Sequence, residues 1–260
     1  AGVVVDLPPA GPARQAAQAL HIGFLSRVQR GRPWLRLKVA ASLDGRTALP
    51  DGRSQWITGA DARRDGHAWR RRAGAVLTGI GTVLADDPQL DVRLVPTQRQ
   101  PLRVVVDSAF ATPPTARLLQ VPGRVLVVGA QAQPERMSAL RAAGAELLLL
   151  PGADGRVDLP GLLQRLAADG VSELHVEAGA VLNAALLVAD LVDELLVYTA
   201  PKLLGPGAGM AALPALPALD QALAFDFTDC QQVGGDLRLL VRRRGADAFL
   251  HPATTADAVA

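Results

Sequence analysis

The sequence has few aromatic residues, almost no cysteine and no long apolar run. Its 260 residues include one cysteine, Cys230, which excludes an internal disulfide framework and a multi-cysteine zinc site and favours a reducing compartment. No uninterrupted apolar stretch is long enough to span a bilayer, and the first residues, AGVVV, lack the basic region of a signal peptide. We therefore expect a cytoplasmic protein without a membrane partner.

The chain also lacks an excess of charge of either sign. Lysine and arginine number 27 against 25 aspartates and glutamates, a formal charge of +2, so nucleic acid has little support as a partner. Hydrophobic residues make up 49% of the chain, which is ample for a core, and the length allows one large domain or two small ones. A globular protein is the expectation.

The most informative stretch spans residues 37–59 and reads LKVAASLDGRTALPDGRSQWITG. Residues 35–41 predict a half-buried strand in which Lys38 needs a partner or a ligand. The turn residues at 50–52, Pro-Asp-Gly, predict that two strands fold back on each other. Residues 58–61 have the spacing of a capping box and predict a helix up to residue 72. Ser54 and Trp56 then precede a helix N-terminus, where anions are favoured.

The rest of the chain alternates strand and helix patterns. Strands are predicted at residues 75–79, 102–107, 124–129, 145–150, 173–177 and 193–200, and helices at 13–30, 134–143, 159–168 and after Gly179. Late strands at 225–227 and 237–241 are expected to be antiparallel, because short links separate them. This order predicts an α/β sheet that is mixed at one edge.

Several local patterns suggest a ligand site, although simpler structural interpretations stay open. Gly79-Ile-Gly-Thr82 lets main-chain N–H groups approach a phosphate, yet a plain strand-to-loop turn is the commoner explanation, and Leu84 breaks the dinucleotide fingerprint. Proline at 88 favours extended geometry at Asp87, which sets Asp86 and Asp87 apart at a turn.

The strongest local signal after residues 37–59 is a strand that ends in Glu177, followed at once by Gly179 and an apolar helix. His175 alternates with Glu177 on that strand and is assigned no role, because a lone strand histidine is usually packed in the core. One helix face is shared by Arg63, His67, Arg70 and Arg71, for which a solvated basic surface is the simpler interpretation.

Six segments in order resemble one family. LKxAxSLDGRTA with GxSxWITG, then GTVLADDPQLDVR, VVVDS, HVEAG and VDELLVYTAPKLLG are similar to the reductase domain of the bifunctional riboflavin-biosynthesis deaminase/reductase, over roughly residues 20–243. The resemblance implies a dihydrofolate-reductase-like α/β fold, with a mixed, mostly parallel sheet flanked by helices. It also implies NADPH-dependent reduction of 5-amino-6-(5-phosphoribosylamino)uracil to its ribitylamino counterpart.

The resemblance also implies a domain plan. Residues 1–30 would be the tail of a preceding deaminase domain, 31–244 the reductase domain and 245–260 a disordered tail. Deaminase chemistry is not expected of this chain, because we expect neither the H-x-E nor the P-C-x-x-C of that zinc site in it. The absence of an initiator methionine suggests a fragment or a processed chain.

Site residues follow from the resemblance by position. Lys38, Asp86 and Glu177 are the expected catalytic group, which orients the opened ribose and relays a proton. The expected substrate contacts are Ser54, Arg70, Leu90, Arg93 and Glu177, with the two arginines as phosphate clamps. The expected NADPH contacts are Ala40, Trp56, Thr82, Asp86, Ser108, Gly179, Ala180, Val181, Leu182, Asn183, Ala184 and Ala185. No metal is expected.

Two other functions stay open. One is a related reductase acting on another pterin-like or pyrimidine-like substrate, because a fold does not fix its ligand. The other is a non-catalytic dimerising or binding domain. A homodimer is expected in either case, although the apolar residues at 186–196 fit a core helix and strand equally well. The preference for NADPH over NADH follows from the resemblance alone.

Overall fold

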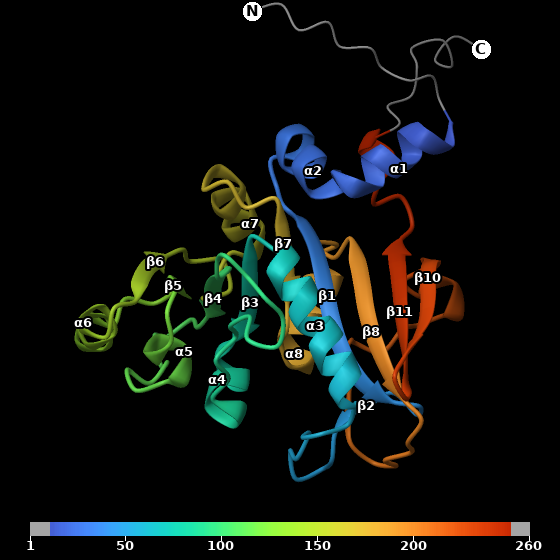
Figure 1. Ribbon diagram of the computed structural model, residues 1–260. Coiled ribbons are helices and arrows are strands. Elements are labelled where there is room, and N and C mark those ends of the chain that lie inside the picture. Colours follow the sequence, from blue (N-terminus) through green and yellow to red (C-terminus); the bar gives the residue numbers. More distant parts are fainter. Residues whose placement is uncertain (1–10, 251–260) are drawn as a thin grey trace, which may run out of the picture.

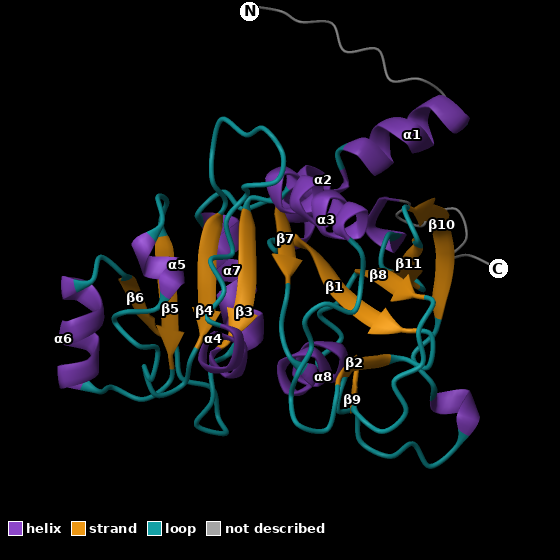
Figure 2. Ribbon diagram, turned by 60° about the horizontal axis from the view of Figure 1, so that its bottom comes forward, coloured by secondary structure: helices purple, strands orange, loops and turns teal. Residues whose placement is uncertain are grey.

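The computed structural model describes residues 11–250 as a twisted sheet with helices on both faces (Figures 1 and 2). The strands are β1 (Trp34–Ser42), β2 (Arg46–Ala48), β3 (Ala75–Gly79), β4 (Leu102–Val106), β5 (Val125–Gly129), β6 (Glu146–Leu149), β7 (Glu173–Val176), β8 (Glu194–Ala200), β9 (Ala208–Gly209), β10 (Phe225–Val233) and β11 (Asp236–Arg243). The α-helices are α1 (Pro12–Leu20), α2 (Ile22–Arg30), α3 (Ala60–Arg72), α4 (Ile80–Asp86), α5 (Arg117–Gln120), α6 (Pro134–Ala142), α7 (Leu159–Ala168) and α8 (Ala180–Val188). Two 3-10 helices are η1 (Leu219–Gln221) and η2 (Ala248–Leu250).

The main sheet has nine strands in the order β10-β11-β8-β1-β7-β3-β4-β5-β6. Strands β8 to β6 in that order are parallel, and β11 and β10 add an antiparallel edge. The predicted mixed, mostly parallel sheet is therefore confirmed. The carboxyl ends of the parallel strands meet at one edge, where open α/β sheets bind ligands.

Alternation along each strand determines which helices cover which face. Val104 of β4 belongs to an apolar cluster with α7 and α8, whereas the next residue, Val105, packs with Leu118 of α5 and Leu140 of α6. Each such leucine, when fully buried, contributes about 1.5–3 kcal/mol. The sheet is thus enclosed between α7 and α8 on one face and α3 to α6 on the other (Figure 2). Among the described residues, no helix combines the length and the apolarity needed to cross a membrane.

The strand after β1 does not pair as predicted. The turn at residues 50–52 forms, since the Gly52 N–H donates to the Leu49 carbonyl at 3.0 Å. However, β2 pairs with β9, not with a strand beyond that turn. Asp44 explains the difference, because its carboxylate accepts the N–H groups of Leu204 and Gly205 at 3.1 and 2.8 Å and draws the distant loop to β2.

Two predicted local conformations are wrong. Helix α3 begins after Gly59 without a side-chain cap, so Thr58 does not open a capping box. Instead the Asp236 carboxylate, from β11, accepts the Gly59 N–H at 2.7 Å. Asp87 is left-handed, with φ 41°, rather than extended, and Asp86 is the last residue of α4. Hydrogen bonds of Asp87 to Val83 and Arg117 stabilise this conformation, which aspartate tolerates better than most residues.

Both ends of the described chain differ from their predictions. The helix predicted at residues 13–30 is two helices, α1 and α2, that meet at His21. Residues from 245 onward were expected to be a tail, but η2 lies beside α2, with the Phe249 ring centroid 6.4 Å from that of Trp34. The rest of the expected tail, 251–260, and the expected linker residues 1–10 lie outside the described part.

Candidate functional site

A cleft of about 1060 Å³ lies at the carboxyl ends of the parallel strands. Its size and place are typical of a cofactor site. The predicted site residues that line it are Lys38, Ala40, Ser54, Trp56, Thr82, Asp86, Ser108, Glu177, Gly179, Ala180, Val181, Leu182 and Ala185. Arg70 and Arg93 line an adjoining pocket of about 360 Å³, which shares Lys38, Trp56 and Glu177 with the cleft.

Three predicted contacts do not line either space. The side chain of Leu90 is buried in the core, and its backbone is left-handed with φ 53°. Asn183 is buried and its amide donates to the Met210 carbonyl at 2.8 Å, so it anchors α8 to the following loop. Ala184 is buried as well. The helical spacing explains the last two, because α8 presents residues 181, 182 and 185 to the cleft and turns 183 and 184 inward.

The ionic centre of the site is Glu177, directly after β7. Its carboxylate binds the Arg70 guanidinium through two hydrogen bonds, one of them from Arg70 Nη2 to Oε2 at 2.9 Å. Lys38 Nζ, from the neighbouring strand β1, lies 4.0 Å from Oε2. The remaining guanidinium nitrogen, Nη1, donates to the Asp91 carbonyl at 2.9 Å. Arg70 is therefore held by both Glu177 and Asp91. Its guanidinium does not belong to the solvated basic surface that was the simpler expectation.

These contacts shift the pKa values of Glu177 and Lys38. Burial alone would raise the pKa of Glu177, but the charge and hydrogen bonds of Arg70, aided by His175 and Lys38, hold it well below its usual range. Burial lowers the pKa of the Lys38 ammonium; Glu177 opposes this and Arg70 reinforces it. At neutral pH Glu177 is an anion, whereas Lys38 releases its proton more readily than an ordinary lysine.

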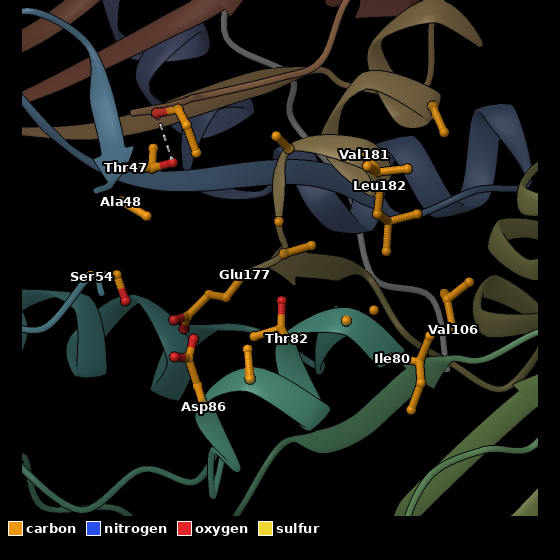
Figure 3. Close-up of a pocket in the computed structure, with 18 of the residues that line it drawn as sticks. Thr47, Ala48, Ser54, Ile80, Thr82, Asp86, Val106, Glu177, Val181 and Leu182 are labelled. Atoms are coloured by element: carbon orange, nitrogen blue, oxygen red, sulfur yellow. Dashed lines mark hydrogen bonds between the residues drawn. The ribbon is translucent and has the colours of Figure 1, made fainter. Parts of the chain in front are cut away.

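Asp86 faces this group from the end of α4. Figure 3 shows the Asp86 and Glu177 carboxylates pointing toward one another in the cleft, with Thr82 beside them. Partial burial raises the pKa of Asp86. The structure thus brings the three predicted catalytic residues to one end of the cleft, from β1, α4 and the end of β7.

Two histidines belong to the site, and neither was predicted to. His175 is fully buried, with Nε2 3.3 Å from Glu177 Oε1. Its alternation with Glu177 in the sequence was the available signal. His67 Nδ1 accepts the Arg93 N–H at 3.2 Å, and burial, with the charges of Arg70 and Arg93, lowers the pKa of His67 to about 4. Neutral His67 thus anchors the backbone of Arg93, whose side chain pairs with Asp91.

Arg63 was also missed as a lining residue. Its guanidinium lies 4.5 Å from the Trp56 ring centroid and donates to the Thr58 carbonyl at 2.7 Å, so it holds the loop that borders the cleft. His175 to Glu177 matches the letters H-x-E of the deaminase signature, which the chain was expected to lack. Within residues 11–250, no group of three or more metal-binding side chains accompanies it.

The other end of the cleft is built from main chain. Gly79 and Gly179 precede α4 and α8, and neither helix start is capped by a side chain. A methyl group at Gly81 would meet no atom within 4 Å, so the backbone there borders open space. Uncapped N–H groups at a helix start favour an anion. The cleft is large enough for a dinucleotide, and the uncapped N–H groups at the start of α8 suit its pyrophosphate.

Comparisons with known proteins agree with one another. Residues 33–239 match the model of a family described as the RibD C-terminal domain. Riboflavin biosynthesis protein RibD of Escherichia coli K12 is 43% identical over 236 residues, 86% of this chain and 63% of the relative. RibD of Haemophilus influenzae is 38% identical over 242 residues, 88% and 63% of the two chains. The chain therefore spans less than two thirds of these relatives.

Solved structures show the same similarity. Acinetobacter baumannii RibD has a TM-score of 0.78 at 39% identity, covering 89% of this chain and 64% of that one. A Thermotoga maritima protein named as a diaminohydroxyphosphoribosylaminopyrimidine deaminase/5-amino-6-(5-phosphoribosylamino)uracil reductase has a TM-score of 0.75 at 26% identity, covering 89% and 62%. These likenesses confirm the expected dihydrofolate-reductase-like α/β fold. With a family match that extends over most of its length, the chain belongs to the RibD C-terminal domain family.

Proposed function

We propose that the chain reduces the ribosyl group of 5-amino-6-(5-phosphoribosylamino)uracil to the ribityl group, with NADPH as the reductant, in riboflavin biosynthesis. The observation that carries the proposal is the group of Lys38, Asp86 and Glu177 at one end of a cleft whose other end has two open helix starts. The name of the Thermotoga maritima relative includes this reductase activity, which supports the choice of substrate.

In this proposal the cofactor lies along the start of α8 and against Thr82 and Ser108, which line the cleft. When bound, NADPH supplies a hydride. The residues of the chain provide position and exclude water: Trp56 and Ala40 border the cleft near Lys38, and main-chain N–H groups of α8 face the anionic part.

The substrate would occupy the side of the cleft that joins the adjoining pocket. Arg93 lines that pocket with its guanidinium about half exposed; Nη1 pairs with Asp91, and the other guanidinium nitrogens are available to bind a phosphate. Arg70 is already bound to Glu177 and Asp91, which suits it to hold Glu177 in place and to add positive charge to the phosphate site.

The reaction opens the ribose to a C1' imine or its equivalent, and the nitrogen gains a proton as C1' gains hydride. Lys38 is the proton donor that its lowered pKa favours. Glu177, held as an anion, serves to orient the opened ribose and to keep Lys38 charged before transfer. Asp86, with its raised pKa, is the group that returns a proton from solvent to this centre.

The test is oxidation of NADPH followed at 340 nm, with the deaminated phosphoribosylamino-uracil as substrate and NADH as the comparison. We expect the wild-type protein to oxidise NADPH only when the substrate is present. We expect this turnover to be lost in Lys38→Ala and Glu177→Gln. NADPH binding without oxidation would contradict the proposal, in favour of another pyrimidine substrate or of a non-catalytic domain. Wild-type turnover in Lys38→Ala, Asp86→Asn and Glu177→Gln would refute the residue assignment.

Three further proposals accompany this one. A homodimer is proposed, to be measured by light scattering on the eluting protein, and a monomer would contradict it. A cytoplasmic location is proposed for the host cell, to be measured by fractionation. The domain plan is also a proposal: residues 31–244 as the reductase domain, joined to a preceding deaminase domain through residues 1–30.

A further inference from the structure

The end of the cleft far from Glu177 carries one cation that the mechanism does not use. Among the described residues, Lys38, Arg63 and Arg156 are the cationic side chains that line the cleft, and the first two also line the adjoining pocket. Arg156 follows β6, four strands from β7 in the sheet order. At roughly 4.8 Å per strand this separation is about 19 Å. Arg156 therefore lies at the opposite end of the sheet edge from the ionic centre.

The loop after β6 fixes the backbone of Arg156 and leaves its side chain available. Its N–H donates to Asp154 Oδ1 at 3.0 Å, and its carbonyl accepts the Gly152 N–H at 2.7 Å. The next residue, Val157, is buried and bridges to Pro151. The side chain itself is 71% exposed, and its Nε is 3.9 Å from Asp154 Oδ2, a weak pairing in water.

Other polar groups surround this position. Ser108, after β4, lines the cleft, as does Gln131, whose amide donates to the Gly155 carbonyl at 3.4 Å. Three segments, which follow β4, β5 and β6, thus contribute Ser108, Gln131 and the weakly paired Arg156 to the lining of the cleft, and these groups suit a phosphate ester. In the proposed function the cleft holds a dinucleotide beside Glu177 and the start of α8, and the residues around Arg156 line the remaining part of the same cleft, where the adenosine end would lie.

We propose that Arg156 binds the 2'-phosphate of the cofactor and thereby selects NADPH over NADH, an inference that rests on the proposed function. The phosphate adds charge that only NADPH carries, so the guanidinium would stabilise one cofactor and not the other. The Asp154 carboxylate is negative, as the phosphate is, and repels it. This repulsion limits how strongly the site favours NADPH over NADH.

The test is the dissociation constant of NADPH, NADH, adenosine 2',5'-bisphosphate and AMP, measured by calorimetric titration without substrate. Arg156→Ala is expected to weaken NADPH and the bisphosphate roughly tenfold and to leave NADH and AMP within twofold. Asp154→Asn keeps the acceptor for the Arg156 N–H and is expected to tighten NADPH alone. Arg165→Ala, which removes an exposed arginine of α7 paired with Asp169 and outside the cleft, is the matched control.

The outcomes separate the two levels of the proposal. If wild-type protein prefers NADPH and Arg156→Ala retains the full preference, or weakens both cofactors equally, Arg156 does not read the phosphate and the inference is wrong. If wild-type protein binds neither nucleotide, the proposed function itself fails. Stronger salt dependence for NADPH than for NADH, lost in Arg156→Ala, supports the inference because screening acts on the extra charge.

Discussion

The two ends of the cleft are built in different ways. At one end Glu177, Arg70 and Lys38 are charged, and the first two are largely withdrawn from water and bound to each other. At the other end glycines begin two helices, and Arg156 extends into solvent. The first arrangement is fixed before any ligand arrives, whereas the second relies on main-chain N–H groups and space.

Because of this difference, we expect substitutions at the two ends to have different effects. A buried charge that loses its partner is left without compensation, so changes at the ionic end reduce turnover or stability sharply. Changes at the glycine end alter how closely a ligand approaches, so they reduce affinity while the fold persists. Substitutions at each end test whether the two ends separate in this way.

The largest effect is expected for Glu177→Gln. The substitution removes the anion that Arg70 and Lys38 face but keeps the size of the side chain. Turnover should fall roughly 10²- to 10⁴-fold, while NADPH affinity stays within a few-fold. Single-turnover kinetics and nucleotide titration measure the two quantities. Glu146→Gln, which changes an exposed pair with Arg124 at the far edge of the sheet, is the control that should keep both.

Arg36 tests whether buried charge on the same sheet face can serve stability alone. It lies two residues before Lys38 on β1, is 2% exposed, and binds Glu194 and Glu173 without lining the cleft. Arg36→Met should lower the free energy of unfolding by about 3–5 kcal/mol, and turnover per folded molecule should be retained. Urea unfolding measures the change in stability, and activity at low urea concentration measures turnover per folded molecule. Adding Glu194→Leu should restore part of the stability, and failure to do so would contradict the ion-pair explanation.

A smaller effect is expected from pH through His67. Its pKa is lowered to about 4 from an ordinary value of 6.5, so the unfolded chain binds the proton more readily than the folded one. Stability contributed by neutral His67 is therefore complete above pH 6.5 and is lost as the pH falls toward 4, by about 2 kcal/mol at pH 5. Denaturant unfolding at pH 7 and pH 5 measures this loss. In His67→Asn, which retains an acceptor for the Arg93 N–H, this part of the pH dependence should disappear.

The separation of the two ends was only partly visible in the sequence. Strands and helices were predicted well where the pattern is local: α7 was predicted with the bounds it has, and Gly170 was the signal for its end. The site residues were grouped by motif resemblance, since Arg70 and Glu177 are 107 positions apart. No periodicity reveals such a pair.

What was missed depends on tertiary contacts. The carboxylate that accepts the Gly59 N–H before α3 belongs to Asp236, 177 residues away, and the partner of β2 comes from the loop that Asp44 holds. Left-handed Asp87 needs Arg117 of another helix. Each of these depends on one or two hydrogen bonds between distant segments, which local propensity does not encode and which outweigh a weak local preference.

The smallest effect is expected at the glycine end, for Gly81→Ala. The added methyl group meets no atom within 4 Å, and alanine inside α4 should stabilise the fold by about 0.5–1 kcal/mol. The same methyl group occupies space in the cleft, so NADPH and NADH should both bind several-fold more weakly, in contrast to Arg156→Ala, which is expected to affect NADPH alone. Thermal unfolding and titration with both cofactors measure the pair of effects. Unchanged affinity for both would mean that the cofactor does not approach the backbone at this helix start, and the main-chain character assigned to this end would be wrong.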